Sequence, residues 1–82
     1  MHKMDTRSLL HSKDLKATPL REAILRVIYR ARKPLSVDEI SQKVQKIDFD
    51  QASLFRSLKA LAEKGLLSQV DLGEGFVRYE AY

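Results

Sequence analysis

Several residue types that mark common classes of protein are absent or scarce in this chain of 82 residues. It has no cysteine, which excludes disulfide bonds and thiolate metal sites, and it has only two histidines, three glycines and two prolines. No apolar run is long enough to cross a membrane, and no secretory or transit-like segment opens the sequence. We therefore expect a cytoplasmic protein that does not contact a membrane.

Catalytic and metal-binding constellations are also missing. The sequence has no paired set of carboxylates, no phosphate-cradling glycine loop and no histidine beside a plausible nucleophile. His2 and His11 lie far apart near one end of the chain, whereas a metal site needs several convergent ligands. We expect a protein that is not an enzyme, with no catalytic residue, cofactor, small-molecule substrate or metal.

The charge is unevenly distributed along the chain. The net charge of +4 and the pI near 9.6 favour an anionic partner. Residues 1–33 carry nine Lys/Arg and three Asp/Glu, a formal charge of +6, whereas residues 34–82 carry six and eight, a charge of −2. The basic charge is therefore concentrated in the first third of one small domain.

The most informative stretch is a predicted helix, residues 50–65. Asp50 can cap its first turn, and Gly65 can adopt the left-handed conformation that ends a helix and brings Leu61 and Leu66 together. An apolar stripe recurs at helical spacing between these ends: Leu54, Leu58, Leu61 and Ala62.

The face of this helix off the stripe is uncharged to basic. It has no carboxylate before Glu63, and it holds Gln51, Ser53, Arg56, Ser57 and Lys59. Such side chains can hydrogen-bond base edges or phosphates, so this face suits a groove of DNA. A solvated helix face is the alternative, because most polar helix faces only meet water.

Two helices are expected before it. Thr18 as N-cap and Pro19 as first helical residue begin a basic helix that stops at Lys33-Pro34. Its predicted buried stripe is Ala23, Ile24, Val27, Ile28 and Ala31.

Ser36 and Glu39 have the spacing of a capping box, flanked by Leu35 and Ile40 as a hydrophobic staple. They begin a second helix that we expect to continue to about Lys46, with its inward face formed by Val37, Ile40, Val44 and Ile47. A short turn at Asp48-Phe49 then makes a helix-turn-helix with residues 50–65.

Beyond Gly65 the pattern changes to that of a β-hairpin. Residues 67–72 and 76–79 are rich in β-branched and aromatic side chains and flank the loop Gly73-Glu74-Gly75. The predicted fold is α+β, mainly α: a winged helix of three helices and a hairpin wing over residues 15–82. Residues 1–14 are expected to form a partly ordered, frayed arm that includes one helical turn.

Within this pattern the sequence resembles the DNA-binding domain of the ferric uptake regulator family. The resemblance runs from Leu15 through Glu80 and includes K-G-L-L before a wing that ends in R-Y-E. Three segments carry it: residues 15–21 (L-K-A-T-P-L-R), residues 35–40 (L-S-V-D-E-I) and residues 52–58 (A-S-L-F-R-S-L).

The resemblance implies regulation of transcription by binding double-stranded DNA in the major groove. Phe55 and Arg56 occupy the positions of a Tyr-Arg pair that contacts DNA in the family. The Phe55 ring can still pack on a thymine methyl group without the phenolic hydrogen bond, although its neighbour Leu54 makes a core position the alternative. The resemblance places Lys16 in the minor groove and Arg21 at a helix start. The predicted DNA surface is Lys16, Arg21, Gln51, Ser53, Phe55, Arg56 and Lys59, with Arg78 on the wing.

Two departures from the family bear on metal binding and assembly. Members carry a C-terminal domain that dimerises and supplies most ligands of a regulatory metal site, and this chain reaches Tyr82 before any such domain. Pro34 stands where the family commonly has a metal-binding histidine, and Glu80 alone at a ligand position is not a site. We expect a monomer that binds no metal.

A winged-helix module for protein–protein contact is the rival function. In that case Phe55, Phe76 and Tyr79 would form an apolar patch. The basic first third and the acid-free front of the helix at residues 50–65 favour DNA instead.

Overall fold

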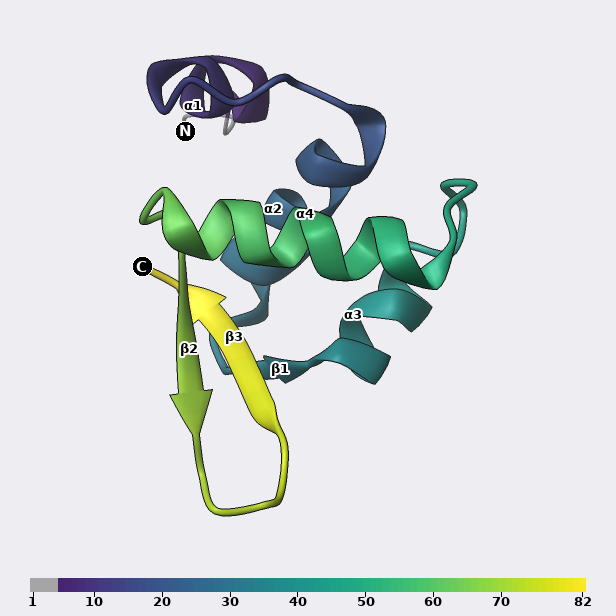
Figure 1. The fold of residues 1–82 in the computed structure, drawn as a ribbon, viewed down its shortest axis with the longest axis vertical. Helices are drawn as coiled ribbons and strands as arrows, with labels where there is room; N and C mark the ends of the chain where they lie inside the picture. Colours follow the sequence, from purple (N-terminus) through teal and green to yellow (C-terminus); the bar gives the residue numbers. More distant parts are fainter. Residues whose placement is uncertain (1–4) are drawn as a thin grey trace.

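The computed structural model describes residues 5–82. Helices α1 and α2 come first, α3 and α4 follow a short strand, and a hairpin closes the chain (Figure 1). The strands form one antiparallel sheet in the order β1-β3-β2. The predicted winged-helix arrangement, mainly helical, is confirmed. Its elements are α1 (Thr6–Ser12), α2 (Pro19–Ala31), β1 (Leu35–Ser36), α3 (Val37–Lys43), α4 (Gln51–Glu63), β2 (Leu67–Asp71) and β3 (Val77–Ala81).

The predicted starts of α2 and α3 are confirmed. Thr18 Oγ1 accepts a hydrogen bond from the backbone N–H of Arg21 at 3.2 Å, which satisfies one of the donors exposed in the first turn of α2. In the capping box of α3, the Glu39 N–H donates to Ser36 Oγ at 3.1 Å, and the Ser36 N–H donates to Glu39 Oε1 at 2.9 Å. Each start is therefore fixed by side chains that are local in sequence.

Both ends of α4 are formed as predicted. Asp50 Oδ1 accepts from the Ser53 N–H at 2.7 Å. Gly65 has a φ of 78°, and the Leu66 N–H donates to the Leu61 carbonyl at 2.9 Å, the long bond of a Schellman motif. Because a side chain at Gly65 would be strained in this conformation, glycine sets the point at which the chain leaves α4 for β2.

The core lies between α2, α4 and the sheet, and α4 packs on both α2 and β2. Of the predicted stripe on α4, Leu54, Leu58 and Leu61 are fully buried and Ala62 is partly buried. On α2, Ala23, Ile24 and Ile28 of the predicted stripe are buried and Val27 and Ala31 are partly buried, whereas Leu20 and Leu25, which were not predicted, are buried. Ser57 was expected on the outer face of α4 but is only 8% exposed, so that residue belongs to the buried side.

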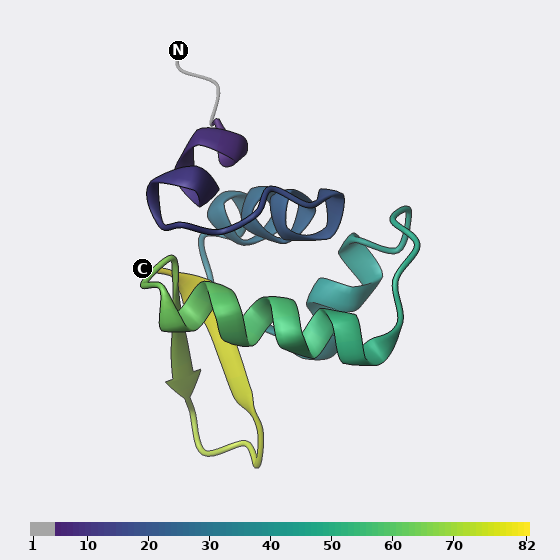
Figure 2. The same cartoon turned by 45° about the horizontal axis from the view of Figure 1, so that its top comes forward.

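The N-terminal arm differs from the expectation of a frayed segment. The helix α1 has two turns, capped by Asp5, and it packs on α2 (Figure 2). Leu10 is fully buried, and the Thr6 hydroxyl donates to Glu22 Oε1 at 2.8 Å. A helix this short is marginal alone, so its order comes from this packing. The part of the arm at residues 1–4 lies outside the described residues.

Two differences concern the elements around the wing. The short strand β1 was not predicted, and it adds a third strand by pairing Leu35 with Tyr79 and Ser36 with Arg78. Helix α3 ends at Lys43 rather than about Lys46, so the connection to α4 is longer than the predicted turn. Among residues 5–82, no helix combines the length and apolar character needed to span a membrane.

Candidate nucleic-acid interface

Helix α4 forms a ridge with a hollow on each side. On the side of α2 the hollow has a volume of about 260 Å³, and we call it the α2-side hollow. It is formed by the start of α2, the connection between α3 and α4, and one flank of α4, and its lining residues are Thr18, Leu20, Arg21, Asp48, Phe49, Ser53, Arg56 and Ser57.

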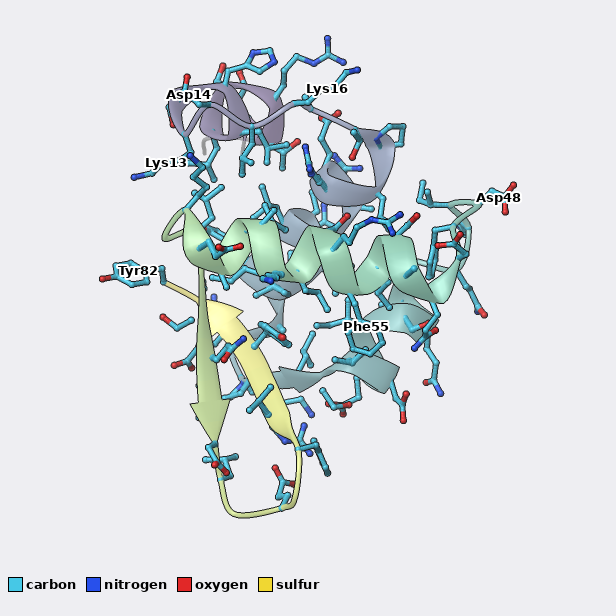
Figure 3. All side chains as sticks on the ribbon, in the orientation of Figure 1. Lys13, Asp14, Lys16, Asp48, Phe55 and Tyr82 are labelled. Atoms are coloured by element: carbon cyan, nitrogen blue, oxygen red, sulfur yellow. The ribbon has the colours of Figure 1, made fainter. Side chains whose placement is uncertain are left out.

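The α2-side hollow gathers polar and cationic predicted residues. Arg21 Nη1 donates to the Lys16 carbonyl at 3.0 Å, which joins the entry to α2 with its first turn. Arg56 is exposed and its Nη2 donates to Ser53 Oγ at 3.3 Å. Three predicted DNA residues, Arg21, Ser53 and Arg56, therefore line this hollow, with Asp48 as the carboxylate in the lining. Figure 3 shows Lys16 on the same side of α4 as α1.

The cap of α4 adds a fixed negative charge beside this region. The hydrogen bonds from the backbone and hydroxyl of Ser53 hold the pKa of Asp50 below its ordinary value, and Arg56 acts in the same direction. Asp50 is therefore ionised at neutral pH and is directed toward the first turn of its own helix. From Gln51 to Ala62 the helix carries no carboxylate, so its outer face remains uncharged to basic.

On its other flank, α4 borders a groove of about 380 Å³, which we call the wing-side groove. Phe55 points from α4 toward β1 and α3 (Figure 3) and is 49% exposed, so the alternative of a core position is wrong. Phe76 is 47% exposed in the same groove, whereas Tyr79 is only 6% exposed. The groove is mainly apolar, and it is lined by Ser36, Val37, Asp38, Phe55, Phe76, Val77 and Tyr79.

Arg78 is held within the molecule rather than presented outward. Its Nε and Nη2 donate to Glu74 at 2.7 and 3.0 Å, and its Nη1 donates to Glu39 Oε1 at 2.7 Å. The guanidinium carbon lies 5.3 Å from the centre of the Phe76 ring. The side chain is 20% exposed. Arg78 therefore differs from the other predicted DNA residues, because its guanidinium is already paired with two carboxylates.

The remaining predicted residues, Gln51 and Lys59, are exposed on α4. The structure thus brings Arg21, Ser53 and Arg56 together, links Lys16 to Arg21 through its backbone carbonyl, and places Phe55 on the opposite flank. Sequence reasoning missed the link between Arg78 and two carboxylates. The spacing of Glu74 and Arg78 was visible, but such spacing indicates neighbours only on a helix, and here a hairpin brings them together.

The model of the ferric uptake regulator family matches residues 12–82. The chain belongs to the ferric uptake regulator family. A search of curated protein sequences gives no match.

Solved structures agree with this family membership in their fold. The ferric uptake regulator of Vibrio cholerae is 22% identical, with a TM-score of 0.84 over 95% of this chain and 62% of its own. That of Pseudomonas aeruginosa, solved with manganese, is 23% identical, with a TM-score of 0.84 over 95% and 60%. The PerR regulator of Streptococcus pyogenes, described in peroxide sensing and gene regulation, is 21% identical, with a TM-score of 0.79 over 98% and 59%. The 82-residue chain therefore spans about six-tenths of the length of these regulators.

Manganese in one of these structures raises the question of a metal site in this member of the family. Within residues 5–82, no group of three or more His, Cys, Asp or Glu side chains is placed to hold a metal ion. Glu80 lies on β3, beside a hollow shared with Arg32 and Lys33, whose cationic side chains do not suit a divalent cation. The donors on the described part of the chain do not fit such an ion.

Proposed function

We propose that this chain binds double-stranded DNA sequence-specifically, as the DNA-contacting part of a transcriptional regulator, with α4 in the major groove. The observation that carries the proposal is the composition of α4 and its surroundings. Between Gln51 and Ala62 the helix has no carboxylate, its Arg56 and Lys59 are exposed, and Arg56 lines the α2-side hollow together with Arg21. Such a surface offers cations to phosphates and hydrogen-bond donors to base edges.

The residues divide into two roles. Lys16, Arg21 and Lys59 neutralise phosphates, and Gln51 and Ser53 add polar contacts near the start of α4. Arg56 reads base edges, because its guanidinium can donate two hydrogen bonds to a guanine. Phe55 packs on a thymine methyl group with the exposed half of its ring. Arg78 is omitted from this contact set because its guanidinium nitrogens already bind Glu74 and Glu39.

The wing-side groove favours a second candidate function, docking of a protein. Phe55 and Phe76 expose about half of their surface there, on the same groove of about 380 Å³. Tyr79, the third aromatic residue of the predicted patch, is buried and contributes little surface. The patch is therefore smaller than the sequence suggested, and DNA binding remains the better-supported function.

The decisive experiment is a titration of the chain with duplex DNA at two salt concentrations. Arg56→Ala should weaken binding to a preferred duplex by about 1–3 kcal/mol and reduce the preference between duplexes. Arg30→Ala is the matched control, because it removes an exposed arginine about 14 Å along α2 from Arg21. If Arg56→Ala folds and binds every duplex as tightly as the parent chain, the proposed role of α4 is wrong and protein docking becomes the better function.

We also propose that the isolated 82-residue chain is monomeric, because its apolar stripes are used in one core. Sedimentation of the chain at micromolar concentration measures this directly. A tight dimer at that concentration would contradict the proposal and would imply that the exposed groove residues form an interface.

A further inference from the structure

The wing carries one cation and several carboxylates. Between Leu67 and Ala81 the only Lys or Arg is Arg78, whereas Asp71, Glu74 and Glu80 are acidic. The hairpin of β2 and β3 extends from α4 on the side opposite α1 in both ribbon views (Figures 1 and 2). A duplex that lies along α4 is therefore close to a wing whose charge depends on whether Arg78 is available.

Arg78 is fully engaged by two carboxylates. Its fork binds Glu74 through two nitrogens at 2.7 and 3.0 Å, which is the bidentate geometry of a strong charge-assisted pair. Its remaining nitrogen binds Glu39 at 2.7 Å. These contacts raise the pKa of Arg78 and lower the pKa of Glu74, and the Ser36 N–H together with Arg78 lowers the pKa of Glu39, so all three groups are ionised at neutral pH.

The same contacts join three separate parts of the chain. Glu74 lies in the hairpin loop, Arg78 in β3, and Glu39 in the first turn of α3. Glu39 Oε1 accepts from both Arg78 and the Ser36 N–H, and Ser36 pairs with Arg78 in the sheet. We call Glu39, Arg78 and Glu74 the wing clamp. Its two carboxylates outweigh the positive charge that Arg78 alone would present.

We propose that Glu39 and Glu74, by pairing with Arg78, withhold its positive charge from DNA. The two carboxylates thereby limit the affinity of the chain for DNA. The inference rests on the DNA binding proposed above. A phosphate could bind the Arg78 fork only by displacing Glu74, because both would occupy the same pair of nitrogens. Removing the carboxylate charges therefore releases the one cation of the wing for a phosphate contact.

The test compares the parent chain with E39Q/E74Q. Glutamine at position 39 can keep the capping box, because its amide oxygen still accepts from the Ser36 N–H. The double variant should bind mixed-sequence duplex DNA more tightly, with a salt slope steeper by about 0.9. In affinity, this is an extra change of about 3.5-fold between about 50 and 200 mM salt.

Two controls separate release of Arg78 from a simple change in net charge. E39Q/E74Q/R78Q and Asp71→Asn each make the chain more positive than the parent by a single charge, and neither offers a released arginine. Asparagine at position 71 can keep the hydrogen bond that Asp71 Oδ1 accepts from the Gly73 N–H at 2.9 Å. Both should have the salt slope of the parent. If either matches the slope of E39Q/E74Q, the inference is wrong.

Folding and function are checked in the same series. Circular dichroism establishes whether each variant is folded, and Glu74→Gln compared with E74Q/R78Q decides the question if the double variant unfolds. If the parent chain binds DNA and E39Q/E74Q has the same salt slope as the parent, this inference is wrong and the proposed function stands. A parent chain that does not bind duplex DNA overturns the proposed function and this inference together.

Discussion

The two flanks of α4 differ in the charge that they can offer to a partner. The α2-side hollow holds Arg21 and Arg56, whose side chains make hydrogen bonds to neutral oxygens and keep their charge. The wing-side groove is mainly apolar, and Arg78 beside it is neutralised by two carboxylates. Attraction to phosphates is therefore expected from the helical side, and contact with apolar surface from the wing side.

This contrast follows from the partners that the fold gives to each cation. Residues 1–33 have a formal charge of +6, and α2 carries part of that charge to the flank of α4. Residues 34–82 have a charge of −2 and hold two arginines, of which Arg78 is paired with carboxylates whereas Arg56 donates to the Ser53 hydroxyl. The value of a cation for binding thus depends on its partners more than on its position on the surface.

The largest expected effect comes from the core on which both flanks depend. Leu58 is fully buried on the inner face of α4, so Leu58→Ala should lower the free energy of unfolding by about 2–5 kcal/mol. Urea denaturation measures the loss. The affinity for DNA should fall as well, because residues of α4 line both the α2-side hollow and the wing-side groove. A variant with parent stability would show that α4 is not anchored as described.

A smaller effect is expected from removing a helix cap on either side of α4. Thr18 caps α2 beside the α2-side hollow, and Ser36 caps α3 beside the wing-side groove. Replacing either by Ala should cost about 1 kcal/mol of stability, because a backbone donor loses its partner. Thr18→Ser and Ser36→Thr keep the hydroxyl and serve as controls. Thermal unfolding that is unchanged in both Ala variants would contradict the capping assignments.

The fold could be predicted where its signals are local. The caps at Thr18, Ser36 and Asp50 and the terminator Gly65 each depend on residues within a few positions, and all were found. The helix α1 and the strand β1 could not be predicted in the same way. Leu10 is buried because α2 lies beside it, and β1 exists because β3 pairs with it, and neither partner is visible from local spacing.

The candidate site shows the same limit. The spacing of α4 correctly indicated that Arg56 and Lys59 are exposed, but it misassigned Ser57, which lies at the edge of the apolar stripe and is covered by the core. The position of Arg78 on the wing was correct, but its engagement was not foreseen. Glu39 lies 39 residues away in sequence, and only the folded sheet brings it to the guanidinium.

The salt dependence of DNA binding should distinguish the two flanks of α4. Arg21→Ala, in the α2-side hollow, should lower the salt slope by about 0.9, because one phosphate contact is lost. Phe55→Ala should weaken binding without changing the slope, because an apolar contact releases no counterions. Titrations of both variants at several salt concentrations measure the difference. A slope that falls equally in the two variants would mean that the flanks do not differ in this way.

Acid should weaken the wing clamp. The Ser36 N–H and Arg78 hold the pKa of Glu39 below its ordinary 4.5, and Arg78 does the same for Glu74. Their contribution to stability is complete above pH 4.5 and is lost as the pH falls through the lowered values in the folded state. Thermal midpoints between about pH 7 and pH 3 should therefore fall less in E39Q/E74Q than in the parent. Parallel curves for the two chains would contradict the wing clamp.

The smallest effect is expected from metal ions, which should leave both flanks unchanged. The described residues contain no cluster of three donors, the chain has no cysteine, and Pro34 cannot act as a side-chain ligand. Adding zinc, manganese or iron to the 82-residue chain should therefore shift neither its thermal midpoint nor its affinity for DNA. Magnesium at the same ionic strength is the control for general screening of phosphates. A rise in the midpoint that is specific to one transition metal, and is reversed by a chelator, would show that ligands converge in a way that the fold does not indicate.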